Sequence, residues 1–270
     1  MSTLWALLIE YDGAPFIGWQ RQARGLSVQQ VLELAASRLA GGAPVATVVA
    51  GRTDAGVHAA GQVAQLSLDR PIGATQLREA LNFHLKPHPV VVLRAAPAPE
   101  GWNARFSAIR RRYRYTILNR RARPALAAGR VWHLPEPLDT GAMADGAGLL
   151  LGRHDFTSFR ASTCQAKTPV RTLDRLDVRR DGERIEIVAE ARSFLHHQVR
   201  NMVGSLRLVG AGRWAPERMG AALAARDRAA AGPTAPPEGL CLMAVAYPAD
   251  PFAGADETAA PRVSPPPPMC

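Results

Sequence analysis

The sequence has few cysteines and no long uninterrupted apolar segment. Its three cysteines, Cys164, Cys241 and Cys270, are far apart and form no CxxC pair. A disulfide framework and a zinc site are therefore not expected, and a reducing cytosol fits best. No stretch approaches the roughly 18 consecutive apolar residues of a membrane-spanning helix. The first eleven residues resemble a strand rather than a basic, cleavable signal, so we expect a cytoplasmic protein without a membrane partner.

Lysine is also scarce, and the basic residues are almost all arginine. Only Lys86 and Lys167 are lysines among 33 basic residues, and the formal net charge is +10. Between positions 101 and 130 there are nine arginines and neither Asp nor Glu. Such a segment favours polyphosphate partners, so a nucleic acid is expected. Arginine enrichment from a GC-rich genome, or a solvated basic face, explains the same composition and stays open.

Hydrophobic periodicity predicts two halves with the same order of elements. In the first half, Ser27 and Gln30 form a capping-box pattern at the start of a helix. Strands are expected near 3–11, 45–50, 61–68 and 90–96, and helices near 28–40 and 75–85. In the second half, strands are expected near 113–118, 171–180, 183–191 and 240–248, and helices near 139–151, 194–210 and 215–227.

This order predicts an α+β fold made of two ferredoxin-like βαββαβ halves. The halves would cover residues 1–104 and 105–248, and their antiparallel sheets would join into one extended sheet. Helices would cover one face, with a basic catalytic cleft between the halves. Residues 249–270 are rich in proline and small residues, which predicts a disordered tail.

The segment "VVAGRTDAGVHAAGQVAQL", residues 48–66, places Asp54 in a glycine-flanked turn between two apolar strands. Asp54 could simply bond its own backbone, as aspartates often do in turns. However, Arg52 and Thr53 add a cation and a hydroxyl that a tight turn does not need. The segment is too short for a phosphate-binding loop and lacks its lysine. The adjacent histidines His196 and His197 are expected to point to different sides of a helix.

The residues also resemble a known family, the A-type tRNA pseudouridine synthases, which share a G-R-T-D-x-G-V-H core. The likeness continues through further blocks in the family's order: "EYDGAPFIGWQRQ", "GWNARFSAIRRRYRYTILN", "GRHDFTSF", "SFLHHQVRNMVGSL" and "EGLCLMAVAYP". Only the proline-rich tail and residues 121–131 fall outside it. The resemblance implies an isomerase that converts uridine to pseudouridine at tRNA positions 38–40, in the anticodon stem-loop. It implies no metal or organic cofactor, and a homodimer with the tRNA spanning both subunits.

The resemblance also implies roles for five residues. Asp54 would be the essential catalytic carboxylate, and Arg200 would pair with it and keep it ionised. Tyr113 would stack on the target base, and Leu240 would pack on the opposite face of that base. Arg52 would enter the RNA stack where the flipped nucleotide leaves it.

Three other readings stay open. The chain could be a non-catalytic RNA-binding protein, although it lacks the aromatic run of the common RNA-recognition motif. It could be a glycosidase or nucleosidase that uses Asp54 with a second acid. It could also be a pseudouridine synthase that acts on other nucleotides.

Overall fold

Alternating side chains in the first strand show how the chain builds a sheet with two different faces. The computed structural model describes residues 2–253. In β1 (Thr3–Tyr11), Trp5 and Leu7 enter the large hydrophobic core, whereas Ala6 belongs to a small apolar cluster. Successive residues of a strand point to opposite faces, so the two clusters lie on opposite sides of the sheet.

The elements follow the predicted order in both halves. The first half contains α1 (Val28–Leu39), β2 (Thr47–Val49), β3 (His58–Leu68), α2 (Ala74–Leu85) and β4 (Val90–Pro97). The second half contains β5 (Arg110–Asn119), β6 (Trp132–Leu134), α3 (Thr140–Gly148), β7 (Gly152–Asp155), β8 (Val170–Asp181), β9 (Arg184–Ala191), α4 (Gln198–Gly210), α5 (Glu217–Ala225) and β10 (Leu240–Ala246). The short strands β6 and β7 were not predicted.

The strands form one ten-stranded sheet with the path β4-β1-β3-β10-β5-β9-β8-β7, to which β2 adds at β3 and β6 at β5. Each half contributes its own antiparallel strands, and the halves meet where β10 runs parallel to β3. The parallel ladder at that junction pairs Cys241 with His58 and Leu242 with Ala59. The predicted α+β fold with one extended sheet is confirmed, while the exact boundary at residue 104 stays a prediction.

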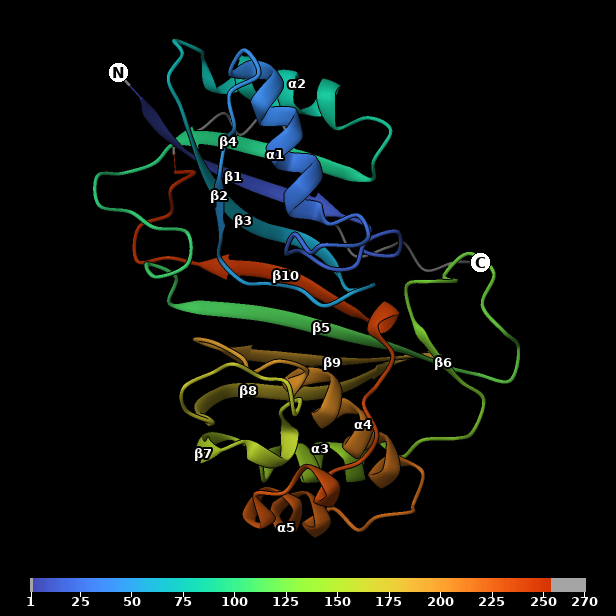
Figure 1. Cartoon of the computed structure of the whole chain (residues 1–270). Coiled ribbons are helices and arrows are strands. Elements are labelled where there is room, and N and C mark those ends of the chain that lie inside the picture. The colour runs from blue at the N-terminus through green and yellow to red at the C-terminus, as the bar shows by residue number, and fades with distance from the viewer. Residues whose placement is uncertain (1, 254–270) are drawn as a thin grey trace.

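The helices pack in two groups, α1 and α2 beside the first half and α3, α4 and α5 beside the second (Figure 1). Their apolar residues, such as Leu32 of α1 and Met202 of α4, belong to the large core. The small cluster on the other face contains no helical residue among those described. As predicted, the Ser27 side chain caps α1 by accepting a hydrogen bond from the backbone N–H of Gln30.

Two predicted boundaries differ from the structure or fall outside it. The helix expected over 194–210 begins only at Gln198, after His197 in the left-handed region with φ 62°. Most of the predicted tail, residues 254–270, lies outside the described residues. Phe252, which belongs to the predicted tail but lies within the described residues, is buried in the small cluster, and its carbonyl oxygen accepts a hydrogen bond from Arg94. Among the described residues, no helix has the length and apolar character needed to cross a membrane.

Candidate active site

The Asp54 loop, residues 50–57, connects β2 to β3 and is fixed by a neighbouring loop. Residue 54 forms an isolated antiparallel bridge with Gly18, and the backbone N–H of Trp19 donates to the Thr53 carbonyl oxygen at 3.0 Å. Gly18 has φ +109°, and a Cβ there would lie 2.7 Å from the same carbonyl oxygen. Only glycine fits this close approach without strain. The backbone that carries the carboxylate is therefore held rigidly.

A network of buried polar side chains also fixes the Asp54 loop. The Tyr11 hydroxyl lies 2.8 Å from Thr53 Oγ1, and the Gln62 side-chain amide donates to the Gly51 carbonyl oxygen at 2.7 Å. The same amide reaches the Tyr11 hydroxyl at 3.3 Å. Burial raises the pKa of Tyr11, despite its hydrogen bonds to Thr53 and Gln62, so its phenol stays neutral. The threonine of the motif thus anchors the loop through its hydroxyl, although the residue also lines the groove.

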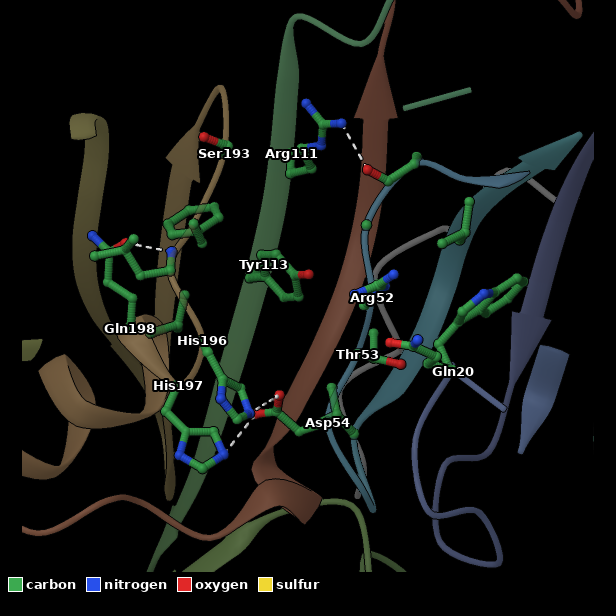
Figure 2. A pocket seen from close by; sticks show the side chains of 18 of the residues that line it. Gln20, Arg52, Thr53, Asp54, Arg111, Tyr113, Ser193, His196, His197 and Gln198 are labelled. Atoms are coloured by element: carbon green, nitrogen blue, oxygen red, sulfur yellow. Dashed lines mark hydrogen bonds and ion pairs between the residues drawn. The ribbon is translucent and has the colours of Figure 1, made fainter. Parts of the chain in front are cut away.

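Asp54 meets three cationic or titratable side chains, two from the residues just before α4 and one from its first turn. Arg200 Nη1 donates to Asp54 Oδ2 at 3.1 Å. His197 Nε2 lies 3.4 Å from the same oxygen, and His196 Nε2 lies 3.3 Å from Oδ1. Figure 2 shows both imidazole rings directed at the carboxylate from the opposite side of the groove. The first half of the chain supplies the carboxylate, and the second half supplies its partners.

Arg200 is itself fixed in position by the backbone of Ala235. Its Nε donates to the Ala235 carbonyl oxygen at 2.8 Å, and the Ala235 N–H donates back to the Arg200 carbonyl oxygen. The Arg200 side chain is only 13% exposed, and that of Asp54 is 19% exposed. An ion pair with so little solvent around it is screened weakly, and an unpaired charge there would be costly.

The partners of Asp54 keep it ionised. Burial raises the pKa of the carboxyl, but the His196 hydrogen bond and the charges of His197 and Arg200 outweigh it, and the pKa falls below its ordinary 3.8. The hydrogen bond to Asp54 raises the pKa of His196 above 6.5, whereas burial lowers the pKa of His197. The site therefore offers a carboxylate at neutral pH, beside a half-exposed histidine whose pKa is raised by that carboxylate.

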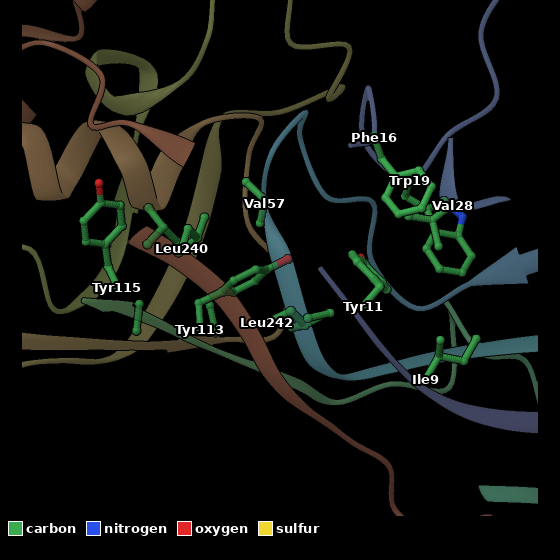
Figure 3. Close-up of a cluster of buried hydrophobic side chains, with 14 of the residues drawn as sticks. Ile9, Tyr11, Phe16, Trp19, Val28, Val57, Tyr113, Tyr115, Leu240 and Leu242 are labelled. Carbon is green, nitrogen blue, oxygen red and sulfur yellow. The ribbon is translucent and has the colours of Figure 1, made fainter. Parts of the chain in front are cut away.

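Tyr113 and Leu240 line the floor of the same site. Tyr113 lies on β5 and packs edge-on against Phe194, with ring centroids 5.3 Å apart. Leu240 begins β10, and both residues are buried in the large core beside Val57 (Figure 3). Burial raises the pKa of Tyr113, and the nearby Tyr11 and Asp54 raise it further. Its phenol is consequently neutral.

These residues line a groove of about 1420 Å³, the Asp54 groove, which lies between the two halves. Its lining includes six arginines, namely Arg52, Arg105, Arg111, Arg171, Arg192 and Arg200. Asp54 is the single carboxylate among the described residues that line it. A groove of this charge attracts polyanions. Its described lining contains no second acid, which the glycosidase reading requires.

Comparison with known proteins decides the family. A model described as tRNA pseudouridine synthase matches residues 7–107 and 147–248, which together make up most of the chain. The chain belongs to the tRNA pseudouridine synthase family. Members of this family are isomerases that act on uridine in tRNA, and the resemblance predicted from the sequence motifs is thereby confirmed.

Individual relatives within the family are highly similar. A tRNA pseudouridine synthase A from Acidiphilium cryptum is 70% identical over 92% of this chain and 98% of its own length. One from Gluconobacter oxydans is 58% identical over 92% of this chain and 91% of its own length. One from Rhodospirillum centenum is 60% identical over 90% of this chain and 99% of its own length. The similarity thus spans both halves of the fold.

The structure brings the five predicted site residues of this pseudouridine synthase to one place. All five line the Asp54 groove: Arg52, Asp54, Tyr113, Arg200 and Leu240. Arg52 is exposed, and it pairs with no carboxylate among the described residues. Tyr113 lies between the two segments that the family model matches, whereas the other four lie within them.

The arginines between 101 and 130 do not form one patch. Only two of the nine line the groove, Arg105 and Arg111. Three others alternate with Arg111 and Tyr113 along β5, so they face the other side of the sheet. There they pair with Glu190 or Glu186, and these three are Arg110, Arg112 and Arg114. Clustering in sequence therefore overstates the positive charge at the site.

The expectation that His196 and His197 point to different sides of a helix is wrong. Both histidines precede α4, which begins at Gln198, and His197 adopts a left-handed conformation with φ 62°. As a result both rings turn to the same side, with centroids 4.0 Å apart. Helical periodicity cannot apply before the first helical residue, and no sequence signal marks a left-handed histidine.

Asp54, His196 and His197 also have the ligand chemistry of a metal site. One ligand atom from each lies within 4.8 Å of the others. However, Arg200 bonds the same carboxylate at 3.1 Å, and its fixed charge opposes a cation there. Within the described residues the arrangement fits an ion-paired carboxylate better than a metal centre.

Proposed function

We propose that this protein isomerises uridine to pseudouridine at positions 38–40 of the tRNA anticodon stem-loop, with Asp54 as the catalytic carboxylate. The observation that carries the proposal is the position of Asp54. It is the one carboxylate in the described lining of an arginine-lined groove, and it is held ionised by His196, His197 and Arg200. Family membership supports the reaction class, and the names of the relatives support tRNA as substrate.

The reaction exchanges one bond to C1′ of the ribose for another. The bond from N1 of uracil to C1′ breaks, the ring turns, and C5 bonds to C1′. C5 then loses its proton and N1 gains one, so neither water nor an oxidant is consumed. One carboxylate suffices for this, whether it attacks C1′, attacks C6, or removes the 2′ proton. Its low pKa keeps it available as a nucleophile or base at neutral pH.

The target uridine of a paired stem must leave the helix before its C5 can be reached. Flipping costs a few kcal/mol, and stacking on an aromatic ring returns about 1–3 kcal/mol. We assign that stacking to Tyr113 and the opposite face of the base to Leu240, which lie together on the groove floor. The exposed Arg52, two residues from Asp54, would fill the vacated place in the RNA stack.

We further propose that the protein works in the cytoplasm as a homodimer and needs no metal or organic cofactor, as the family resemblance implies. A balanced isomerisation requires no redox group. Light scattering of the protein with and without tRNA tests the dimer. Full activity after dialysis against a chelator tests the absence of a metal requirement.

Tritium release tests the proposed function directly. A tRNA transcript with uridine tritiated at C5 should release tritium when the protein is added, and mapping should find pseudouridine at positions 38–40. Free uracil would instead support a nucleosidase. Binding without tritium release would support a non-catalytic RNA-binding protein. Pseudouridine at other positions would support the proposed reaction but contradict positions 38–40 as its target.

A further inference from the structure

Phe106 is a large apolar side chain that stands exposed at the Asp54 groove. It lies in the loop between β4 and β5, and it is 72% exposed while lining the groove. Single exposed hydrophobic residues are common on protein surfaces and need no explanation alone. At this position, however, the surrounding loop fixes the backbone that carries the ring, and the ring lies beside the cationic Arg105.

Hydrogen bonds within the loop fix its shape. The side-chain oxygen of Asn103 accepts from the backbone N–H groups of Arg105 and Phe106, at 2.9 and 3.0 Å. The Asn103 N–H donates to Ser107 Oγ at 3.0 Å, and the Ser107 N–H donates back to the Asn103 carbonyl oxygen. The backbone under Phe106 is therefore held by the loop's own hydrogen bonds.

The buried guanidinium of Arg111 ties this loop to the Asp54 loop. Its Nη2 donates to the carbonyl oxygens of Arg105 at 2.8 Å and Ala50 at 2.7 Å. Its Nη1 donates to the carbonyl oxygens of Ala108 and Arg192. Figure 2 shows Arg111 reaching toward the loop that leads to Arg52. Because Ala50 opens the Asp54 loop, the position of Phe106 is fixed relative to the catalytic carboxylate.

Arg105 adds a positive charge beside the exposed Phe106 ring. Its guanidinium carbon lies 5.5 Å from the centroid of the Phe106 ring, within cation–π range, and both residues line the groove. An exposed aromatic ring next to an arginine matches an unpaired base and its phosphate, because a base offers a π-face to the ring. The groove carries six arginines, so a polyanion is a better occupant than an apolar peptide.

We propose that Phe106 is a stacking platform for an unpaired RNA base next to the target uridine, with Arg105 bonding the adjoining phosphate. The inference rests on the proposed function and names a second contact of the same substrate. It differs from the role of Tyr113, whose ring is buried in the floor of the groove. Phe106 presents its ring to solvent, where a second base can reach it.

Substitutions at Phe106 test the platform against a matched control. Phe83 is 70% exposed on α2 and does not line the groove, so Phe83→Ala removes an equally exposed ring elsewhere. Binding of a fluorescein-labelled anticodon stem-loop RNA is measured by anisotropy. Phe106→Ala should weaken it about 5- to 150-fold, the equivalent of one lost base–aromatic stack. Phe83→Ala should leave it within twofold.

The choice of replacement separates stacking from plain apolar contact. Phe106→Tyr should restore wild-type affinity, whereas Phe106→Leu should bind nearly as weakly as Phe106→Ala. If Phe106→Leu or Phe106→Ala binds as tightly as the wild type, the platform does not exist. Because the ring is exposed, melting temperatures of these variants should match the wild type, which excludes a folding defect.

Tritium release by the wild type distinguishes failure of the proposed function from failure of the stacking platform. If the wild type releases no tritium from C5-labelled tRNA, the proposed function fails. If it does, and the Phe106 variants bind RNA like the wild type, only the stacking platform fails. The expected result is tritium release by the wild type, with kcat/KM lowered in Phe106→Ala and restored in Phe106→Tyr.

Discussion

Arg200 Nη1 lies 3.1 Å from Asp54 Oδ2, although 146 residues separate the two in sequence. Asp54 stands in the first half of the fold, and Arg200 stands in the first turn of α4 in the second. The site therefore exists only when both halves are folded and joined across β3 and β10. This single contact has consequences for stability, pH dependence and catalysis.

Removing the arginine should destabilise the protein through the aspartate. Arg200→Met leaves a weakly exposed carboxylate without its fixed cation, and we expect a loss of about 1–3 kcal/mol at pH 7, because the histidines compensate in part. Urea unfolding measures it. Because the folded pKa of Asp54 is depressed, the stabilisation is present above pH 3.8 and disappears as pH falls through the lower folded value.

The same urea unfolding measurement in an Asp54→Asn background shows whether the ion pair between Asp54 and Arg200 causes the loss of stability. Arg200→Met should then cost clearly less, because no charge is left unpaired. An equal loss in both backgrounds would mean that the hydrogen bond to Ala235, rather than the ion pair, explains the effect.

His196 should give stability a second pH dependence of opposite sign. Its folded pKa is raised, so its contribution is complete below 6.5 and disappears as pH rises through the folded value. The histidine is 41% exposed, and solvent screening limits the effect to about 1 kcal/mol or less. Wild type and His196→Asn should differ most near pH 5 to 6 in urea unfolding. A difference that grows above pH 8 would contradict the assignment.

Gly18 should be required because of the close approach to the Asp54 loop. Gly18→Ala places a Cβ 2.7 Å from the Thr53 carbonyl oxygen at φ +109°. Gly42→Ala is the control, because Gly42 has φ +93° with nothing within 4 Å of the added carbon. Both changes strain the backbone by about 1 kcal/mol or more, and only Gly18→Ala adds a clash. Thermal melting should show the larger loss in Gly18→Ala, accompanied by reduced tritium release. Equal losses would contradict the steric explanation.

Tyr113→Phe separates the ring from the phenol. The ring keeps its stacking surface, so RNA binding should change less than twofold. If the neutral phenol takes part in proton transfer at C5, turnover should fall by about 10²- to 10⁴-fold. Single-turnover tritium release with saturating protein measures the chemical step. Wild-type turnover in Tyr113→Phe would limit the residue to stacking.

The sequence predicted the strands and helices well because strand alternation and helix caps depend on residues that are close together in the chain. Alternation along β1 and the Ser27 cap of α1 depend on residues close in sequence, and both appear in the structure as expected. The parallel pairing of β3 with β10 forms only when the two halves assemble, and no local sequence pattern predicts it. The family motif, rather than periodicity, located Asp54.

The parts that sequence reasoning missed depend on tertiary contacts. Both histidines reach Asp54 because His197 takes a left-handed conformation that delays the start of α4. Arg111 looked like one member of a basic run. It is in fact buried, and its guanidinium joins two loops through backbone carbonyl oxygens. The alternation of β5 could have shown that its neighbours face away from the groove.

The most direct test of the account is Asp54→Asn. The amide has the shape of the carboxylate but neither its charge nor its nucleophilicity, so RNA should still bind within a few-fold. Tritium release from C5-labelled tRNA should fall by about 10³-fold or more. Release at the wild-type rate would show that Asp54 is not the catalytic carboxylate.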